Sequence, residues 1–509
     1  MKAAVDSWVA TLIPCDYVKK IRMPKKTETK VIREAVTGYQ TLQPYEVLVL
    51  DSPILQRLRR IHQTALAYLV YPTANHTRFD HSLGCASIAQ RMGEMLIPGR
   101  TTRIKELRLA ALLHDVGHAF FSHLSESVME SRFRDKYKVL NKAKQFEDLN
   151  LHLGEMISYL VVTSEPFRNF LDEIVHHYDS RVDLDNVANL VVHNPDRALR
   201  YMGDIISGPF DADKLDYLVR DCQFCGIRAD VDVERVVISA RRLDAKRFPA
   251  AEHPERILVM NSGGVSILEQ ITFNKMLLYP SVYHHHKIRA IECMARSIFE
   301  IIWDDPDALV DQRLRFDSIK DFYRFTDLEF LATVSAESRN KQVAEVAQRI
   351  LSRDLFKRCL VIFHRYLRDA PVRQRKDRKW IHLTKRRYET APDSMRELRR
   401  WIWDALPERH RDGITIHDIW VDNPTPPPIG GDADRAFVDI GTRQLVPLSE
   451  FFPYPEWTTT YETNKLKAHV FSLADDDVRR AVNKAAIGVL KERFSVEFDR
   501  RATDECKIR

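Results

Sequence analysis

The alternation of hydrophobic and polar positions predicts helices along most of the chain. Between Arg103 and Val116, hydrophobic residues recur every three or four positions, so they share one wide face of a helix that stops at Gly117. Asp51 or Ser52 can cap an earlier helix, and Pro53 fits its first turn. The helical pattern continues from there to about residue 360. It predicts a mainly α-helical fold.

Strand-like patterns occur near both ends of the chain. Lys30–Ile32, followed by Gly38, predicts a small hairpin or turn. Late in the chain, residues 414–421 and 467–471 have the pattern of strands, and residues 475–494 have that of a helix. The last third therefore has the pattern of a smaller α+β module.

Proline and glycine mark the clearest loop of the chain, at residues 423–431. Together with the helical and strand-like patterns, this loop leads us to predict three parts. They are an N-terminal lead-in over residues 1–30, a helical domain over residues 31–360 and a C-terminal α+β lobe over residues 361–509.

Composition agrees with a folded helical protein. The 509 residues are 44% hydrophobic and 29% charged, and 16 are Gly, which disfavours a β-sandwich. No stretch reaches the roughly 18 apolar residues that a membrane span needs, and the N-terminus shows no cleavable signal pattern. The net charge of +6 fits a local basic pocket for an anionic ligand better than a surface that coats nucleic acid.

The cysteines predict no disulfide framework. There are seven, an odd number, and they are widely spaced. We therefore expect a cytoplasmic protein with no membrane partner. Cys222 and Cys225 form a CxxC motif, but no second pair or nearby histidine completes a zinc site. A packed pair of thiols is the favoured interpretation, and a zinc site is the alternative.

Histidines and aspartates at four places in the helical region form a candidate metal site. An adjacent His and Asp at a helix end can both reach one cation, and a histidine from an earlier helix and an aspartate from a later one complete the set. Two histidines and two aspartates suit Mn, Fe, Ni, Mg or Zn and leave positions for water and phosphate. Any one such histidine alone is more often a core or surface residue. Their order and helical flanks favour a site at His81, His114, Asp115, His152 and Asp213.

The motifs around these residues resemble those of the HD-domain deoxynucleotide triphosphohydrolases. That group includes bacterial dGTP triphosphohydrolases and the vertebrate SAM- and HD-domain dNTP triphosphohydrolase. The resemblance runs from about residue 30 to 300 and implies an all-helical HD-domain core, a C-terminal lobe for regulation or oligomerisation, and a homo-oligomer, either dimer or tetramer. It rests on residues 51–61, 71–72, 76–84, 114–123 and 211–221, with Gly226.

The resemblance also implies catalytic roles. His118 and His152 would contact the α-phosphate, and His123 would protonate the leaving 5′-oxygen as general acid. Glu126, one turn beyond His123, would orient it, although the family more often has Asp there. In this chemistry, water activated by the metal attacks phosphorus, cations neutralise the growing charge, and a near-neutral imidazole delivers the proton. The implied metal ligands are His81, His114, Asp115 and Asp213.

Substrate contacts follow from the same resemblance. Arg78, Lys214 and Tyr217 are the implied phosphate contacts, since Arg can grip phosphate through two parallel bonds. Gln63 and Asp221 are the implied partners of the sugar 3′-hydroxyl. The alternative for each is a surface or helix-capping role.

A second stretch, Tyr283–Lys287, lies where related enzymes place an aromatic residue against the sugar and a basic cluster near phosphate. Helix-borne histidines at successive positions point in different directions, so at most two can face one ligand. Tyr283 and Lys287 are the favoured ligand contacts. Two positions depart from the family: Met276 aligns near an Arg that reaches the terminal phosphate, and Thr64 replaces a Leu at the sugar edge. Recognition of the terminal phosphate and exclusion of ribose therefore stay open.

Regulation by an activating nucleotide is a further implication. Five residues fall where the vertebrate enzyme binds such a nucleotide between subunits, and Arg33 replaces a polar neutral residue there. The alternative is that Asp51 and Arg59 form intrahelical or buried ion pairs. The five residues are Lys30, Val31, Asp51, Gln56 and Arg59.

A basic run at residues 373–379, with residues 385–387 soon after, allows three interpretations. A solvated loop is favoured over a nucleic-acid contact. A regulatory nucleotide site is the third, because the last third matches the family's allosteric lobe in position.

The sequence therefore favours a metal-dependent dNTP triphosphohydrolase, with dGTP as the first guess, that releases deoxynucleoside and triphosphate. Nucleotide-pool housekeeping and nucleotide depletion in antiviral defence would use the same chemistry. One alternative is an HD-type phosphodiesterase or nuclease that acts on nucleic acid or a signalling nucleotide. Another is a catalytically weak nucleotide sensor or scaffold, against which the complete ligand set argues. Gln63, Lys214, Tyr217 and Asp221 favour mononucleotides.

Overall fold

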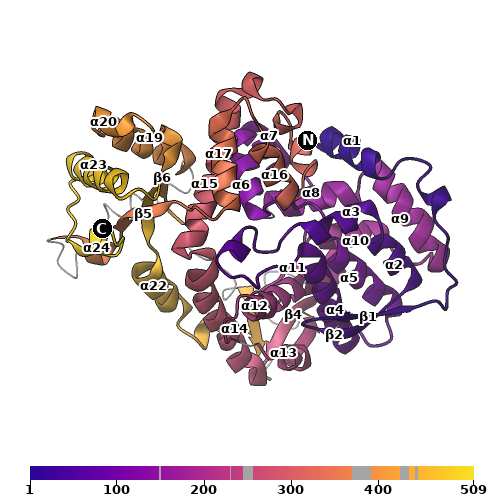
Figure 1. The fold of residues 1–509 in the computed structure, drawn as a ribbon. Coiled ribbons are helices and arrows are strands. Elements are labelled where there is room, and N and C mark those ends of the chain that lie inside the picture. The colour runs from indigo at the N-terminus through magenta and orange to yellow at the C-terminus, as the bar shows by residue number, and fades with distance from the viewer. Residues whose placement is uncertain are drawn as a thin grey trace. The chain divides into compact units, whose positions relative to one another are not determined.

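The computed structural model describes residues 1–147, 149, 151–229, 231–244, 256–368, 391–424, 435–441 and 445–508. Helices dominate these residues and the strands are short, which confirms the predicted mainly α-helical fold (Figure 1). The basic run at residues 373–379 and 385–387 lies outside the described residues, as do residues 425–431 of the predicted loop.

The chain forms two compact units, and each collects segments that are separate in sequence. The first unit contains Met1–Leu278, Phe316–Phe330 and Pro428–Glu456. The second contains Tyr279–Arg315, Leu331–Pro427 and Trp457–Arg509. The limits that we derived from the sequence pattern, at residues 30 and 360, stay a prediction.

Helix α5 (Thr101–Leu113) lies at the centre of the first unit. It packs along α4 (Arg78–Leu96) and against α10 (Leu184–Val191) and α11 (Arg200–Ser207). Every residue from Glu106 to Leu113 is buried, so α5 is covered on all sides, whereas its sequence pattern predicts one wide hydrophobic face.

Charged side chains inside this helix are paired. Glu106 accepts hydrogen bonds from Arg103 at 2.6 Å and from Asn186 at 2.7 Å. Arg108 donates to Glu46 at 2.5 Å. Burial of an unpaired charge is costly, and these partners make the burial of the C-terminal part of α5, from Glu106 to Leu113, tolerable.

The predicted cap at Ser52 is confirmed. Its side chain accepts a hydrogen bond from the Leu55 amide at 3.5 Å, and Pro53 begins α3 (Pro53–Arg57). This helix is short and continues only as a 3-10 turn, Leu58–Arg60. The remaining helices of the first unit include α1 (Lys2–Leu12), α2 (Pro44–Leu50), α6 (His123–Arg132), α7 (Arg134–Asn141), α8 (Leu153–Val162), α9 (Glu165–Tyr178), α12 (Ala212–Phe224), α13 (Val233–Ser239) and α14 (Val265–Leu278).

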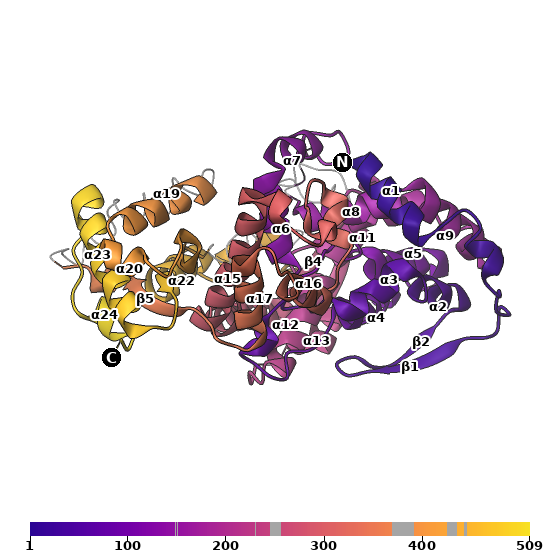
Figure 2. The ribbon, with the colours of Figure 1, turned by 45° about the horizontal axis from the view of Figure 1, so that its top comes forward.

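The hairpin predicted after Lys30 is present. Strands β1 (Lys30–Glu34) and β2 (Gly38–Leu42) pair antiparallel and lie side by side in Figure 2. Gly38 closes the turn with φ +78°, a left-handed conformation that glycine adopts without strain.

The prediction of helix up to about residue 360 is wrong over two stretches of the first unit. Strands β3 (Ala240–Asp244) and β4 (Arg256–Asn261) pair antiparallel there. They belong to a four-stranded sheet of order β3-β4-β7-β8, whose other strands are β7 (Phe437–Asp439) and β8 (Leu445–Pro447). Strand β3 pairs with the neighbouring β4, but β4 also pairs with β7 from far along the chain, so local periodicity gives little sign of this sheet.

The second unit has the predicted α+β composition. Its sheet has the order β5-β9-β6, with both pairings antiparallel, and comprises β5 (Lys357–Ile362), β9 (Ala468–Ser472) and β6 (Ile419–Asp422). Its helices include α15 (His286–Asp304), α16 (Asp327–Ser335, which begins in the first unit), α17 (Lys341–Leu351), α19 (Ala391–Asp404), α20 (Glu408–Arg411), α22 (Tyr454–Lys465, which also begins in the first unit), α23 (Asp476–Phe494) and α24 (Arg501–Asp504).

The late elements match their sequence predictions closely. Strand β9 and helix α23 agree within a residue or two, and Asp475 caps α23 by accepting from the Asp477 and Val478 amides. Only the end of residues 414–421 is a strand, since Ile416–Asp418 forms a 3-10 turn. Buried aliphatic residues of the sheet and of α23 form the core of this unit.

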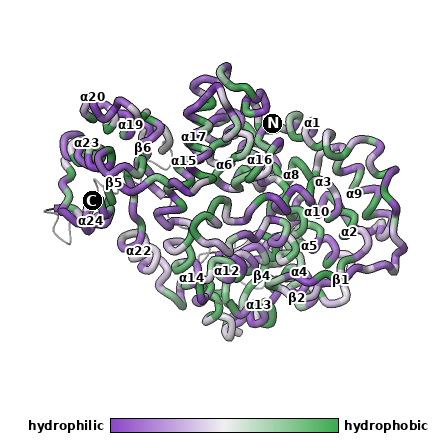
Figure 3. The backbone as a smooth tube through the Cα atoms, viewed as in Figure 1, coloured by the Kyte–Doolittle hydropathy of each residue, from purple (hydrophilic) through white to green (hydrophobic). Residues whose placement is uncertain are grey.

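Hydrophilic and hydrophobic positions alternate along most helices (Figure 3). In the described ranges, no helix combines the length and the apolar character that crossing a membrane requires. The CxxC cysteines, Cys222 and Cys225, are buried and are not joined by a disulfide, and their interpretation as a packed pair stays a prediction.

Replacement of Leu112 by Ala tests the central position of α5. Leu112 is fully buried, and its truncation is expected to lower the free energy of unfolding by about 2–5 kcal/mol because it leaves a cavity. Met95, on α4, is 45% exposed, and Met95→Ala is expected to change that free energy by less than about 0.5 kcal/mol. Urea denaturation followed by circular dichroism measures both. Equal losses would contradict the central burial of α5.

Candidate active site

His81 on α4 is oriented by a carboxylate behind it. Its Nδ1 lies 2.8 Å from Asp216 Oδ2, and its Nε2 lies 3.0 Å from Asp213 Oδ1. Metal-ligating histidines commonly hold one ring nitrogen in this way while the other faces the ion. The ring is completely buried, so its direction is fixed by these contacts.

The Asp216 carboxylate is itself held by Arg220. Arg220 donates to both oxygens of Asp216 at 2.8 Å and also bonds Glu34 at 2.5 Å. Gly84 gives this network its space, because a Cβ atom there would lie 1.8 Å from an Asp216 oxygen. The glycine of the motif at residues 76–84 is therefore required by close packing.

His114 caps the end of α5 and presents a free ring nitrogen. Its Nδ1 lies 2.7 Å from the Ala111 carbonyl oxygen. Its Nε2 is buried and has no hydrogen-bond partner among the described residues. That nitrogen lies 3.4 Å from Asp115 Oδ1 and 4.0 Å from Asp213 Oδ1. A buried acceptor without a partner, beside two carboxylates, fits a cation ligand.

The four predicted metal ligands converge. Ligand atoms of His81, His114 and Asp213 lie within 4.8 Å of one another, and Asp115 Oδ2 lies 3.6 Å from His81 Nε2. Two imidazoles and two carboxylates fit a divalent metal of the Mn, Fe, Ni, Mg or Zn class. The donor set does not select one metal among these.

Two neighbours of the cluster also shape it. Arg78 donates to Asp115 at 2.6 Å. Burial disfavours the charged form of Asp115, but Arg78 and His114 hold the pKa of its carboxyl well below its usual range. Cys85, which the sequence reading missed, places its Sγ 3.5 Å from both ring nitrogens of His81. Its position one turn after His81 on α4 was the available signal.

A second group joins the metal cluster through His118. His118 Nε2 lies 3.0 Å from Asp115 Oδ1, and its Nδ1 contacts Glu126. The other oxygen of Glu126 lies 3.1 Å from Nδ1 of His123. Burial opposes ionisation of Glu126, but His118 and His123 hold the pKa of its carboxyl well below the usual range. Glu126 thus bridges the two histidines.

His123 and His152 differ from the buried members of the site. The side chain of His123 is 70% exposed, and His152 caps α8 at the surface. Their ring centroids are 6.4 Å apart. Gly154 lets α8 approach, since a Cβ there would lie 2.5 Å from a Glu126 oxygen and 2.8 Å from the His118 ring. His118, His123, Glu126 and His152 are therefore gathered at one place, as predicted.

Polar neighbours already engage several predicted substrate contacts. Arg78 donates to Ser122 as well as to Asp115. Lys214 Nζ lies 2.6 Å from Asp211 and 2.7 Å from the Gly208 carbonyl oxygen. Asp221 lies 2.8 Å from Nε2 of the buried His76, a residue the sequence reading did not single out.

Gln63 and Tyr217 complete the predicted contacts of the first unit. The Gln63 amide donates to the His76 carbonyl at 3.1 Å, which ties Gln63 to the motif at residues 76–84. Its side-chain Oε1 is buried without a hydrogen-bond partner among the described residues. This oxygen could therefore accept a hydrogen bond from a donor group of a ligand. Tyr217 lies on α12, one turn after Asp213. The substrate roles of these residues stay predictions.

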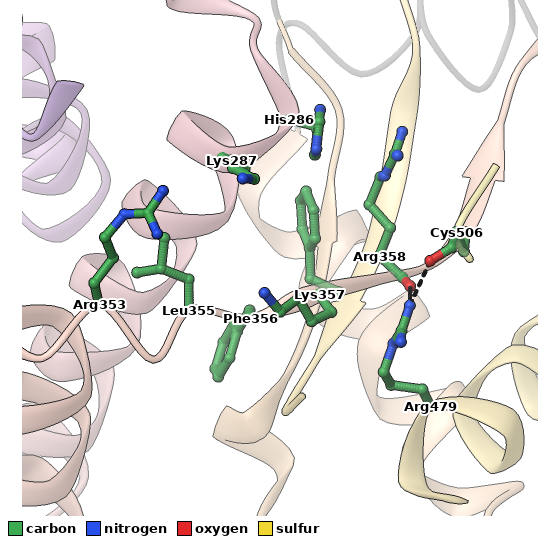
Figure 4. Close-up of a pocket in the computed structure, with 10 residues that line it drawn as sticks. His286, Lys287, Arg353, Leu355, Phe356, Lys357, Arg358, Arg479 and Cys506 are labelled. Carbon is green, nitrogen blue, oxygen red and sulfur yellow. Dashed lines mark hydrogen bonds between the residues drawn. The ribbon is translucent and has the colours of Figure 1, made fainter. Parts of the chain in front are cut away.

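Tyr283 and Lys287 lie in the second unit. The sequence predicts that they share one helix, but the structure places them in different elements. Tyr283 ends a π-helical turn, and α15 begins only at His286, with His285 as its cap. Lys287 lines a cavity of about 110 Å³ within this unit (Figure 4). None of the predicted metal ligands lines it. The cationic side chains around it are Lys287, Arg353, Lys357, Arg358 and Arg479, and His286 also lines it.

The residues predicted for an activating nucleotide lie on β1 and around α3. Lys30 and Val31 are exposed, and the Val31 side chain is 63% exposed. Arg59 donates to Gln56 at 3.0 Å and lies 3.7 Å from the Phe79 ring centroid. Asp51 is exposed at the end of α2. Nucleotide binding there stays a prediction.

Two family models match parts of this chain. A family model described as HD domain matches residues 78–221, and one described as HD associated region matches residues 231–387. Residues 78–221 therefore form an HD domain. The first match contains His81, His114, Asp115 and Asp213, so the whole metal cluster lies inside the HD domain.

Curated relatives extend the similarity. An uncharacterized protein of Methanocaldococcus jannaschii is 31% identical over 52% of this chain and 48% of its own length. The human deoxynucleoside triphosphate triphosphohydrolase SAMHD1 is 26% identical over 67% of this chain and 56% of its length. Its Dictyostelium discoideum homolog is 25% identical over 67% of this chain and 62% of its length. The chain thus spans between 48% and 62% of these relatives.

Two solved structures resemble the fold of most of the chain. A hypothetical protein from Aquifex aeolicus has a TM-score of 0.59 and 22% identity, and the match covers 90% of this chain and 99% of that one. A phosphohydrolase from Bacteroides thetaiotaomicron has a TM-score of 0.59 and 20% identity, covering 88% and 100%. At these identities the likeness concerns the fold alone.

Metal affinity tests the geometry of the cluster without any substrate. Asp216→Asn is expected to weaken Mn²⁺ binding about 10- to 100-fold, because the His81 ring loses the carboxylate that orients it. His114→Ala removes a ligand and is expected to weaken binding by more than about 100-fold on the same scale. Isothermal titration calorimetry measures both.

The matched control is His177→Ala, at an exposed histidine on α9, which is expected to leave Mn²⁺ affinity unchanged. Equal affinity in wild type and His114→Ala would show that the ion binds elsewhere.

Proposed function

We propose that this protein is a metal-dependent phosphohydrolase that converts a deoxynucleoside triphosphate to deoxynucleoside and triphosphate. The observation that carries the proposal is the junction of two groups at Asp115. Asp115 Oδ2 lies 3.6 Å from His81 Nε2 in the metal cluster. Asp115 Oδ1 lies 3.4 Å from His114 Nε2 and 3.0 Å from His118 Nε2, and His118 begins the His118, Glu126 and His123 series. Similarity to the named triphosphohydrolases supports the substrate class.

In this proposal, His81, His114, Asp115 and Asp213 hold the metal. A divalent ion there supplies Lewis acidity toward a phosphoryl oxygen and toward the attacking water. The chain's own cations bind the phosphates. Arg78 is buried beside the cluster. Burial and Arg78 lower the pKa of His118, but Glu126 and Asp115 raise it by more, so the cationic form of His118 is favoured.

Proton delivery falls to His123. Water attacks the α-phosphorus, the bond from phosphorus to the 5′-oxygen breaks, and His123 gives its proton to that oxygen. The exposed ring of His123 can reach a ligand in solution, while Glu126 holds its Nδ1 at 3.1 Å and so leaves Nε2 to face the substrate. Gln63 and Asp221 bind the sugar 3′-hydroxyl, and His152 adds a contact to the α-phosphate.

Each dNTP incubated with the purified protein and Mn²⁺ or Mg²⁺ tests the reaction. The expected products are deoxynucleoside and intact triphosphate, with dGTP as the best substrate, resolved by ion-exchange chromatography. His123→Ala is expected to slow dNTP turnover about 10²- to 10⁴-fold, the usual rate enhancement from a general acid. Release of only orthophosphate or pyrophosphate would contradict the mechanism. Cleavage of a phosphodiester instead would identify the alternative HD-type phosphodiesterase.

We further propose that the basic cavity of the second unit binds the phosphates of an activating nucleotide. Two helices and one strand supply its cations: Lys287 from α15, Arg479 from α23, and Lys357 and Arg358 from β5. Arg479 is held in place by the Arg358 and Cys506 carbonyl oxygens, at 2.9 and 2.5 Å (Figure 4). Burial, with Arg358, lowers the pKa of His286 to about 3, as expected among cations.

Activation in nucleotide mixtures tests this cavity. Lys357→Ala and Arg353→Ala are expected to weaken activation by a second dNTP in the mixture by at least about tenfold, because each removes a cation that would bind phosphate. The rate without activator is expected to stay unchanged. Lys341→Ala, at an exposed lysine on α17, is the matched control. Activation that survives both cavity variants would contradict the proposal. The proposal also includes a homo-oligomer and a role in nucleotide depletion against viruses.

A further inference from the structure

The backbone just before His123 is strained. Phe121 and Ser122 have φ values of +57° and +50°, a region that non-glycine residues adopt rarely. Helix α6 begins at His123, directly after these two residues. Strain of this kind persists only where the surroundings hold it, and it occurs at functional sites. The turn fixes the position from which the His123 ring leaves the backbone.

One buried carboxylate holds this turn. Asp327 Oδ1 accepts a hydrogen bond from the Phe121 amide at 2.7 Å. Ser122, the second strained residue, donates its hydroxyl to the His62 carbonyl oxygen at 3.0 Å and accepts from Arg78 at 3.0 Å. Asp327 is 1% exposed, so its contact with the Phe121 amide does not compete with water.

The same carboxylate also holds His62, at the start of the segment that carries Gln63. Asp327 Oδ2 accepts from the His62 amide at 2.8 Å and lies 2.7 Å from His62 Nδ1. His62 immediately precedes Gln63, whose buried Oε1 lacks a partner among the described residues. Asp327 therefore joins the segment that carries Gln63 to the turn that carries His123.

Aromatic packing seats Asp327 in its place. It belongs to the segment Phe316–Phe330, which returns to the first unit. Phe316, Phe322, Phe325 and Phe330 all pack on the Phe120 ring, with centroids 4.4 to 6.3 Å apart. In the same segment, Tyr323 donates to the Gly117 carbonyl at 2.6 Å. The segment thus covers the backbone from Gly117 to Phe121.

We propose that Asp327 is a positioning residue for catalysis, which sets the distance between the general acid His123 and the sugar-binding residue Gln63. Asp327 touches neither metal nor substrate, and it acts through the Phe121 amide and through His62. The inference rests on the proposed function, in which His123 protonates the leaving 5′-oxygen. A role in folding alone would affect all reactions of the site equally, whereas a positioning role affects those that need the proton.

The test compares two leaving groups on the full chain loaded with Mn²⁺. A dNTP releases an alkoxide that needs a proton, whereas bis(4-nitrophenyl) phosphate releases a nitrophenolate that does not. Asp327→Asn keeps an acceptor for Phe121 but turns a donor toward His62. We expect it to lower kcat for the dNTP by at least about 30-fold, within the range of general-acid effects, and to lower the aryl ester rate by less than about threefold. Glu329→Gln, at an exposed carboxylate two residues along α16, is the matched control.

Hydrogen exchange supplies a measurement that needs no substrate. Asp327→Ala is expected to speed amide exchange in residues 118–123 by at least about tenfold, with Mn²⁺ affinity within about twofold of wild type, because the turn loses its anchor. Unchanged exchange, or equal losses with both substrates, would overturn the role of Asp327. Wild-type protein that releases no triphosphate, together with faster exchange in Asp327→Ala, would refute the proposed function and leave the anchoring role intact.

Discussion

The structure of the first unit depends on the burial of several negative charges in one small volume. Asp115, Asp213 and Asp216 all lie around the two metal-facing imidazoles, and carboxylates this close repel one another in a medium of low dielectric constant. Each has a cation or an imidazole against it. Arg78 pairs with Asp115, and Arg220 pairs with Asp216. A divalent ion between His81 and His114 would balance the remaining charge.

Much of the surrounding fold supplies room or partners for this arrangement. Glu34 on the hairpin β1–β2 pairs with the second side of Arg220, so a surface element contributes to the charge balance behind His81. Gly84 provides the space for Asp216 and Arg220, and Gly154 lets α8 approach Glu126. The glycines and charged residues near the motifs are thus explained by packing around a buried ionic cluster, beyond the ligands themselves.

The predictability of each feature follows the distance in sequence over which it is determined. The Ser52 cap and the helix over residues 475–494 depend on adjacent residues, and the sequence predicts both. The convergence of the four candidate metal ligands could be expected because each lies in a short motif with an identifiable neighbour, and their role as ligands stays a prediction. Strands β3 and β4 were missed because β4 pairs with β7, far along the chain. Cys85, His76 and Asp327 act through partners that the fold brings near, and Asp327 lies 206 positions from Phe121.

The segment that carries Asp327 also connects the two units through the chain. Residues on both sides of Phe316–Phe330 belong to the second unit, whereas the segment itself packs in the first, around Phe120 and Phe121. The chain therefore enters and leaves the segment that anchors the turn before His123 through residues of the second unit. Interfaces of packed aromatic rings shift between discrete arrangements more readily than they deform continuously. A discrete shift of the rings around Phe120 would therefore displace Asp327, and with it the turn before His123 and the segment that carries Gln63.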